Sequence, residues 1–317
     1  MTRTADPDAG DALAAFAGER PRLRALAYRL LGSVADAEDT LQDAWLRWSA
    51  VASGSVASPP AFLTTLVTRL ALDRMRSARA ARERYYGLWL PEPDVTGWPG
   101  DAGEGDAEAG ETVPMAMLLL LERLGPEQRA VFVLREAMDL DYAEIASVLG
   151  KSADACRQVM RRARARLSEP AAAQADLQAG RRIADAFAAA SLRRDYAAIV
   201  SLLADDAQWL SDGGGLVLTA VNPLHGADRI ARFLLGIQRK RATSFGFTAV
   251  RVNGAPGFLT RLGDRFQGVW ALDIADGRIR RIYQVANPRK LGHIALGHAA
   301  RGQTALGHPA RPGTDAG

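Results

Sequence analysis

The sequence predicts a multidomain fold, in which two all-α helical domains precede an α+β domain with a curved antiparallel sheet. Apolar residues recur at helical spacing through the first half of the chain, which indicates amphipathic helices. An acidic, glycine-rich stretch at 91–112 separates two such helical runs. After Pro170, one further helical stretch gives way to short alternating apolar runs punctuated by glycine, the pattern of half-buried strands.

Composition limits the class of protein. A chain of 317 residues can form two or three domains, and 48% apolar with 24% charged residues is ordinary for a soluble protein. The longest apolar run is too short to span a membrane, the N-terminus lacks a signal-peptide core, and a single cysteine, Cys156, excludes an internal disulfide. We therefore expect a cytoplasmic protein without a membrane partner. No metal-ligand cluster or phosphate-binding loop stands out, so no metal or cofactor is expected.

The first helical domain contains an acidic surface. Helical spacing runs to Gly32, a second helix begins near Ala35, and a long helix begins at Pro60. The second helix carries Trp45 and Trp48 on an apolar stripe. Its other side carries an acidic and polar set: Asp36, Glu38, Asp39, Gln42 and Asp43. Such a face is either simply solvated or docks on a basic partner, and the residues alone leave both readings open.

The second helical domain ends in a helix-turn-helix at 141–167. Gly150 ends its first helix and Ser152 is a good N-cap for the next. Cys156 faces the first helix as a packing residue, while residues 157–166 hold five arginines and no acid. The second helix is therefore predicted to enter a DNA major groove, with a solvated arginine-rich face as the alternative. A further basic cluster, with five arginines, lies at 74–84.

The C-terminal half should form the α+β domain. Helices are predicted at 177–194 and 226–238. The strand candidates are 208–210, 216–220, 248–252, 258–262, 266–274 and 279–285. The repeated ALGHAARG and ALGHPARPG within residues 291–317 predict a disordered tail.

Four segments, in this order, resemble the extracytoplasmic-function (ECF) sigma factors of bacterial RNA polymerase. They are YRLLGSVADAEDTLQDAWLRW at 28–48, AFLTTLVTRLALDRMRS at 61–77, LGPEQRAVFVLRE at 124–136, and the helix-turn-helix. The resemblance implies a sigma-2 domain at 12–80, a linker at 81–112 and a sigma-4 domain at 113–168. It implies an alternative sigma factor that binds core RNA polymerase, recognises the minus-35 and minus-10 promoter elements and initiates transcription.

Three further motifs are similar to those of a subgroup with a cone-shaped SnoaL-like regulatory domain, here at 178–290. They are YYGLWLPEP at 85–93, SDGGG at 211–215 and NPRKL at 287–291. The chain departs from the subgroup at Leu216, where the subgroup has a lysine, and at Arg289, where it has an aspartate.

The resemblance also implies residue roles. It assigns polymerase binding to Asp39, Gln42, Asp43 and Trp45. Opening and reading of the minus-10 element falls to Phe62, Thr65, Arg69, Asp73 and Arg76. Reading of the minus-35 element falls to Ser152, Asp154, Arg157, Gln158 and Arg161. The sequence adds phosphate contacts from the rest of the arginine cluster, Arg162, Arg164 and Arg166.

The C-terminal domain is expected to regulate the sigma domains by contacts within the chain. The residues proposed for these contacts are Trp89, Leu90, Pro91, Asp212, Gly213, Gly214, Gly215, Asn287, Pro288, Lys290 and Leu291. Catalysis is not expected, because Asp212, His225, Asp264 and Asp273 form no evident acid–base set. A small ligand in the cone stays open as a further partner. The alternative function is a helix-turn-helix regulator fused to a small-molecule-binding or isomerase-like SnoaL domain.

Overall fold

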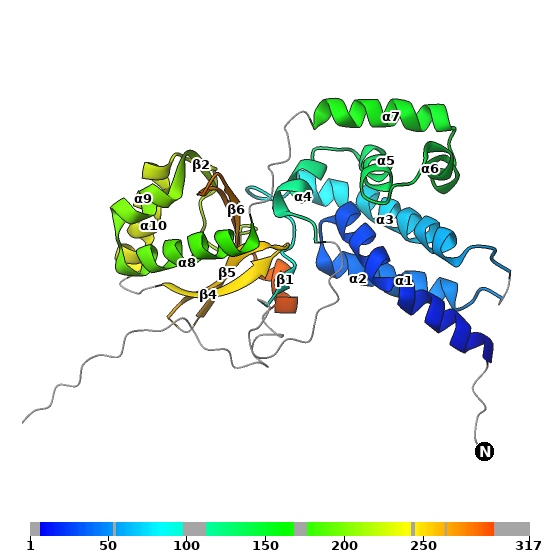
Figure 1. Cartoon of the computed structure of the whole chain (residues 1–317), viewed down its shortest axis with the longest axis horizontal. Coiled ribbons are helices and arrows are strands. Elements are labelled where there is room, and N and C mark those ends of the chain that lie inside the picture. The colour runs from blue at the N-terminus through cyan, green and yellow to red at the C-terminus, as the bar shows by residue number, and fades with distance from the viewer. Residues whose placement is uncertain are drawn as a thin grey trace, which may run out of the picture. The chain divides into compact units, whose positions relative to one another are not determined.

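In the computed structural model, the chain forms two compact units (Figure 1). A helical unit comprises Met1–Asp94 and Gly105–Ala172, and an α+β unit comprises Val95–Glu104 and Ala173–Gly317. The predicted order of fold classes, helical and then α+β, is confirmed. The structure describes residues 7–52, 55–97, 112–167, 176–241, 245–263 and 265–294. Residues 98–111 of the predicted linker and residues 295–317 of the predicted tail lie outside these ranges.

Seven helices are described in the helical unit. They are α1 (Pro7–Leu31), α2 (Val34–Trp48), α3 (Pro59–Glu83), α4 (Met115–Leu121), α5 (Pro126–Glu136), α6 (Tyr142–Leu149) and α7 (Ala153–Arg166). The break predicted at Gly32 follows from local chemistry, because Gly32 adopts a φ of +66°. Ser33 then caps α2 by accepting a hydrogen bond from the backbone of Asp36.

The helices predicted as two separate domains share one hydrophobic core. Buried Leu26 of α1, Val67 of α3, Val131 of α5 and Ile145 of α6 belong to one contiguous cluster. A buried arginine joins the two sets, because Arg129 Nη1 on α5 donates to the carbonyl of Leu30 at 2.9 Å. Within this unit, α1–α3 and α4–α7 are therefore packed against one another.

The α+β unit contains a seven-stranded sheet in the order β1-β4-β5-β6-β7-β2-β3. The strands are β1 (Val95–Thr96), β2 (Leu203–Asp212), β3 (Leu224–His225), β4 (Phe245–Val252), β5 (Ala255–Leu262), β6 (Arg265–Ala275) and β7 (Arg278–Val285). Neighbouring strands pair antiparallel, except that β2 and β7 pair parallel. The sheet is therefore mixed rather than purely antiparallel. A parallel pair is accessible here because a long crossover, including a helix, separates β2 from β7 in the chain.

Three helices cover one face of this sheet: α8 (Leu177–Arg193), α9 (Tyr196–Leu202) and α10 (Ala227–Arg241) (Figure 1). An aromatic cluster fills the core between them. Trp209 and Trp270 meet edge to face with their ring centroids 4.6 Å apart, and Phe247 lies 5.4 Å from Trp270. Phe247 also contacts Phe258 at 5.3 Å, so this face of the sheet is closely packed.

The structure corrects several predicted elements. The strand predicted at 216–220 is wrong: it follows Gly214 and Gly215, whose φ values of +59° and +72° turn the chain out of the sheet. The two-residue strand β1 and the short helix α9 were not predicted. Residues 292–294, assigned to the tail, form a helical turn in which Ile294 is buried. No helix in the described part of the chain is long and apolar enough to cross a membrane.

Candidate functional site

The helix-turn-helix is built from local capping interactions. Asp141 caps α6, since its Oδ1 accepts hydrogen bonds from the backbones of Ala143 and Glu144, both at 2.8 Å. Gly150 ends α6 with a φ of +65°, a left-handed conformation that favours glycine. Ser152 Oγ then caps α7 by accepting from Ala155 at 3.2 Å. The turn predicted from Gly150 and Ser152 is confirmed.

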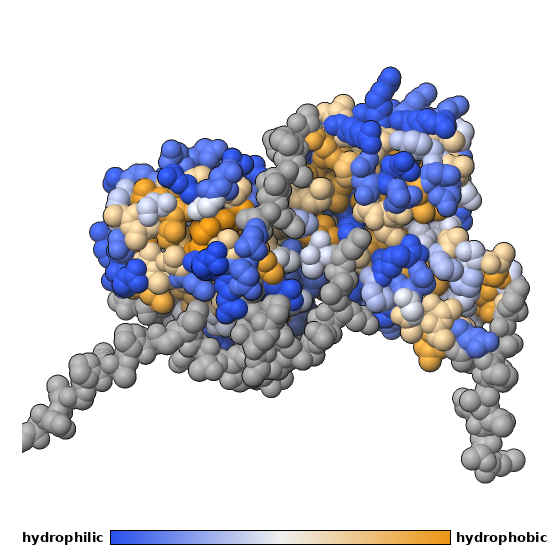
Figure 2. All heavy atoms as spheres, in the orientation of Figure 1, coloured by the Kyte–Doolittle hydropathy of each residue, from blue (hydrophilic) through white to orange (hydrophobic). Residues whose placement is uncertain are grey.

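Helix α7 has two chemically distinct faces. Its buried side consists of Cys156, Val159, Met160 and Ala163. Cys156 is fully buried, and this burial raises the pKa of its thiol, as expected for a packing residue. Figure 2 shows hydrophilic side chains over α7 at the upper right. Every residue predicted for the minus-35 element is exposed: Ser152, Asp154, Arg157, Gln158, Arg161, Arg162 and Arg164.

The arginines of α7 differ in their partners. Arg157 pairs with Asp154, and its guanidinium carbon lies 5.4 Å from the ring centroid of Tyr142. Arg164 Nη2 lies 2.6 Å from Glu136 Oε1 on α5. Arg161 and Arg162 make no ion pair with any residue that the structure describes. Arg161 and Arg162 can therefore bind an anion without first releasing a carboxylate.

The residues predicted to read the minus-10 element follow one side of α3. Phe62 packs on Trp48 with a centroid distance of 5.6 Å, and Thr65 Oγ1 donates to the carbonyl of Ala61. Arg69 is exposed, and its Nε donates to the carbonyl of Val148 on α6 at 3.1 Å. Further along α3, Asp73 and Arg76 form an exposed ion pair at 3.3 Å.

The acidic side of α2 is partly neutralised within the unit. Arg74 of α3 reaches Asp43 at 2.7 Å and Asp39 at 3.8 Å. Gln42 is exposed. One turn later, Leu46 is 60% exposed, an apolar residue that sequence analysis did not select. The sequence could have indicated that Leu46 lies on this surface, because position 46 follows position 42 by four residues and so shares its helix face.

The Trp45 ring, also predicted for polymerase binding, is half-buried against Phe16 of α1 at 5.3 Å. Trp45 therefore helps to pack α2 against α1.

The segment after α3 is fixed to the start of α2. Leu90 is fully buried, and a carbon of the Trp89 ring lies within 3.1 Å of where a Cβ on Gly32 would be. The Glu92 backbone N–H donates to the Gly32 carbonyl at 2.9 Å, and Glu92 Oε2 accepts from Ala35 N at 3.1 Å. A carboxylate is favourable there, because α2 begins at Val34 with its positive dipole end.

Two more polar contacts, which sequence analysis missed, anchor the same segment. The Tyr28 hydroxyl donates to the Glu92 carbonyl at 2.6 Å, and Asp94 pairs with Arg24 at 3.0 Å. Trp89, Leu90 and Pro91 were predicted to contact the C-terminal domain, which stays a prediction; the segment is bonded to the helical unit as far as Asp94.

The two predicted motifs of the α+β unit contact each other. Lys290 Nζ lies 2.7 Å from Asp212 Oδ2, and both side chains are buried. The Asp212 carbonyl also accepts from the backbones of Ala286 at 2.8 Å and Asn287 at 3.1 Å. Asp212 Oδ1 accepts from Gly214 N at 3.0 Å, so the side chain also shapes the turn that follows β2.

Glycine is required at one position of this loop. A Cβ on Gly213 would lie 2.3 Å from the carbonyl oxygen of Val217, far below any normal contact. Asn287 Oδ1 caps the short helix η1 (Pro288–Lys290) by accepting from Arg289 N. Leu291 is buried directly after it. Gly215 completes the turn before Leu216, so the two motifs form one ordered cluster.

Three of the residues considered for acid–base chemistry lie on three different strands. Asp212 is held in the ion pair on β2, and His225 is exposed on β3. Asp273 on β6 lies 3.5 Å from Arg281, and its burial raises the pKa of its carboxyl. Asp264 lies outside the described residues. Within the described ranges, no group of three or more His, Cys, Asp or Glu could hold a metal ion.

Comparison with known proteins matches both halves of the helical unit. The family Sigma-70 region 2 matches residues 15–81, and Sigma-70, region 4 matches residues 115–167. Over 286 residues the chain is 40% identical to the ECF RNA polymerase sigma factor SigJ of Mycobacterium tuberculosis, covering 87% of this chain and 91% of that protein.

Two further matches extend across both units. The probable ECF RNA polymerase sigma factor SigI of Mycobacterium tuberculosis is 32% identical, with 88% of this chain and 94% of SigI covered. The crystal structure of Mycobacterium tuberculosis SigJ matches with a TM-score of 0.71 and 35% identity, over 88% of this chain and 98% of that one. The similarity therefore includes the α+β unit as well as the helices.

Proposed function

Because this chain belongs to the ECF family of RNA polymerase sigma factors, we propose that it binds core RNA polymerase and directs it to promoters read at minus-35 and minus-10 elements. RNA polymerase and promoter DNA are the partners that the family implies, and sigma factors are not enzymes. The observation that carries the proposal is α7, whose buried face fixes it in a helix-turn-helix while its exposed face presents arginines.

Helix α7 reads the minus-35 element in this proposal. Arg157 and Arg161 can each make a bidentate contact to guanine, and Gln158 can do so to adenine; each good contact contributes about 1–3 kcal/mol of discrimination. Arg162, Arg164 and the adjacent Arg166 contact phosphates, which position the helix without selecting a sequence. Asp154 orients Arg157 through their ion pair.

Helix α3 reads the minus-10 element with its exposed polar residues. Strand opening there extrudes a base at a cost of a few kcal/mol, which pocket contacts offset without nucleotide hydrolysis. To contact DNA, Arg69 must give up its hydrogen bond to the Val148 carbonyl, and Arg76 must give up its ion pair with Asp73. Asp39, Gln42 and Asp43 dock on core polymerase, and Leu46 adds an apolar contact beside them.

Regulation by the C-terminal domain acts, we propose, through the segment that joins the two units. Residues up to Asp94 are bonded to the helical unit, and the next two residues form β1, which pairs with β4 of the α+β unit. A change in either unit therefore reaches this segment by direct covalent connection. A ligand of the C-terminal domain could shift the equilibrium only by binding one state of the chain more tightly than another.

Transcription with purified components tests polymerase binding and promoter recognition together. Core polymerase and genomic promoter fragments should give a defined run-off product only when the protein is added. If the protein instead binds duplex DNA tightly alone and leaves polymerase unaffected, the alternative holds: a helix-turn-helix regulator fused to a ligand-binding domain.

The regulatory part is tested separately, with the full-length chain carrying Thr96→Pro. Proline removes a backbone donor and disfavours pairing of β1 with β4. Transcription activity should change while affinity for core polymerase stays within about twofold of the unmodified protein. Unchanged transcription would contradict regulation through this connection without affecting the sigma-factor assignment.

A further inference from the structure

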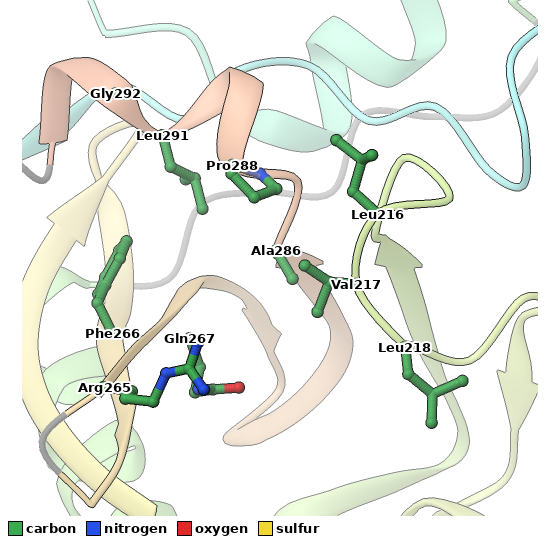
Figure 3. A pocket seen from close by; sticks show the side chains of 10 residues that line it. All are labelled: Leu216, Val217, Leu218, Arg265, Phe266, Gln267, Ala286, Pro288, Leu291 and Gly292. Carbon is green, nitrogen blue, oxygen red and sulfur yellow. The ribbon is translucent and has the colours of Figure 1, made fainter.

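A cavity of about 440 Å³ opens at the ends of β2, β6 and β7 in the α+β unit (Figure 3). Its volume falls within the roughly 300–1,000 Å³ typical of small-molecule sites. Three segments line it: the loop after Asp212 with Leu216, Val217 and Leu218; the start of β6; and the chain from Ala286 to Gly292. The cavity is therefore formed where the two sequence motifs of this unit meet.

This cavity is distinct from the core between the sheet and its helices. None of its lining residues belongs to the hydrophobic cluster in which α8, α9 and α10 pack on the sheet. That cluster is occupied by aromatic rings, including Trp209 and Trp270 in edge-to-face contact. A ligand of this unit is better accommodated at the ends of the strands than among those packed rings.

The chemistry of the walls selects the kind of ligand. Leu216 and Leu218 are 56% and 87% exposed, and together they give this wall of the cavity an apolar surface. Figure 3 shows Arg265 and Gln267 on one side of the cavity, with Pro288 and Leu291 on another. Among the described residues no carboxylate forms an ion pair with Arg265. We propose that this cavity binds a small organic anion with an apolar body, whose acidic group pairs with Arg265.

A buried ion pair and two backbone hydrogen bonds connect two walls of the cavity. Asp212 begins the loop that carries Leu216 to Leu218, and Lys290 lies in the opposing segment between Pro288 and Leu291. Their buried ion pair and the two backbone bonds to the Asp212 carbonyl hold both walls in place. Lys290 is already paired with Asp212, so Arg265 is the lining cation that is available to a ligand.

Two fluorescent probes test the site on the full-length protein without polymerase. Anilinonaphthalene sulfonate carries an anionic group on an apolar body, and phenylnaphthylamine has a similar body without the charge. Both should bind at one saturable site, the anion more tightly. Arg265→Gln should weaken sulfonate binding about tenfold, as loss of one charge-assisted hydrogen bond would, and change phenylnaphthylamine binding less than twofold.

Two further variants separate this site from general apolar binding. Gly292 lines the cavity, and a Cβ on it meets nothing within 4 Å, so Gly292→Phe adds a ring beside the site without a clash at its first atom and should weaken binding of both probes. Arg229→Gln removes an exposed arginine of α10 outside the cavity and should change neither. Circular dichroism checks the fold of each variant. Equal sulfonate binding by the Arg265→Gln protein, or unchanged binding of both probes by a folded Gly292→Phe protein, would overturn the proposal.

Discussion

Arg69 of α3 donates a hydrogen bond to the backbone carbonyl of Val148, the penultimate residue of α6, at 3.1 Å. A residue proposed to read one promoter element is thus bonded to the helix-turn-helix proposed to read the other, inside one compact unit. Promoter binding by Arg69 requires this bond to be exchanged for a bond to DNA. The two functions of Arg69 can be separated by experiment.

Arg69→Ala should lower both stability and transcription. Loss of this part-buried hydrogen bond should reduce the unfolding free energy of the helical unit by about 0.5–1.5 kcal/mol. Arg76→Ala is the matched control, because Arg76 lies on the same helix and forms its ion pair with exposed Asp73, three residues away. It should reduce transcription and leave chemical unfolding within about 0.5 kcal/mol. Equal unfolding of the two variants would show that the Val148 bond contributes nothing.

The arginines of α7 should separate into sequence-reading and phosphate-binding residues. Arg161→Ala should weaken binding to a minus-35 element by about 1–3 kcal/mol and relax base preference at one position. Arg162→Ala should weaken all sequences alike and reduce the slope of log affinity against log salt by about 1. Binding of promoter fragments by the polymerase complex at several salt concentrations measures both. The interpretation fails if Arg162→Ala alters base preference and Arg161→Ala does not.

Arg164 provides an internal comparison on the same helix. Glu136 already pairs with it at 2.6 Å, so DNA binding must first break that bond. Arg164→Ala should therefore cost less promoter affinity than Arg162→Ala.

The buried pair of Asp212 and Lys290 should dominate the stability of its end of the sheet. Lys290→Met leaves the Asp212 carboxylate buried without its cation and should cost about 3–5 kcal/mol of unfolding free energy. Removing both charges with Asp212→Asn and Lys290→Met should cost less than Lys290→Met alone. Chemical denaturation of the three proteins measures this. If the double variant is less stable than Lys290→Met alone, the unpaired Asp212 carboxylate carries no desolvation penalty. That result would contradict the stabilising role given to the buried ion pair.

Asp273 predicts a pH dependence of stability. Its burial raises the pKa of its carboxyl above the ordinary 3.8, while Arg281 and Arg280 oppose the shift. The folded protein therefore retains this proton to a higher pH than the unfolded chain does. Its contribution to stability is present below pH 3.8 and is lost as pH rises through the folded pKa.

The matched variant for this effect is Asp273→Asn, which cannot titrate. The unfolding free energy of the unmodified protein relative to the variant should decrease as pH rises from about 4 to 7. Urea denaturation at intervals across that range measures the difference. A difference that is constant, or that grows with pH, would contradict the upward pKa shift.

Local chemistry explains which elements the sequence predicts well. The helix-turn-helix depends on residues near one another in the chain, such as Asp141, Gly150 and Ser152, whose capping roles do not need the rest of the fold. The packing role of Cys156 follows in the same way from helical spacing. The predicted contact roles on DNA and polymerase remain proposals that come from family resemblance.

Features that depend on distant parts of the chain were not predictable in this way. Asp212 and Lys290 lie 78 residues apart, so their pairing depends on the parallel alignment of β2 with β7. The apolar run Leu216–Ala220 imitates a strand, but glycines with positive φ turn it away from the sheet. Strand β1 has only two residues, too few to show alternation, and pairs with β4 far along the chain.

Run-off transcription with purified core RNA polymerase tests the central claim most directly. The full-length protein should form a complex with core enzyme and produce a transcript with one defined start, and Arg161→Ala should reduce that product about tenfold with polymerase binding unchanged. If the folded protein neither joins core polymerase nor yields a defined transcript from any promoter fragment, its assignment as a working sigma factor is contradicted.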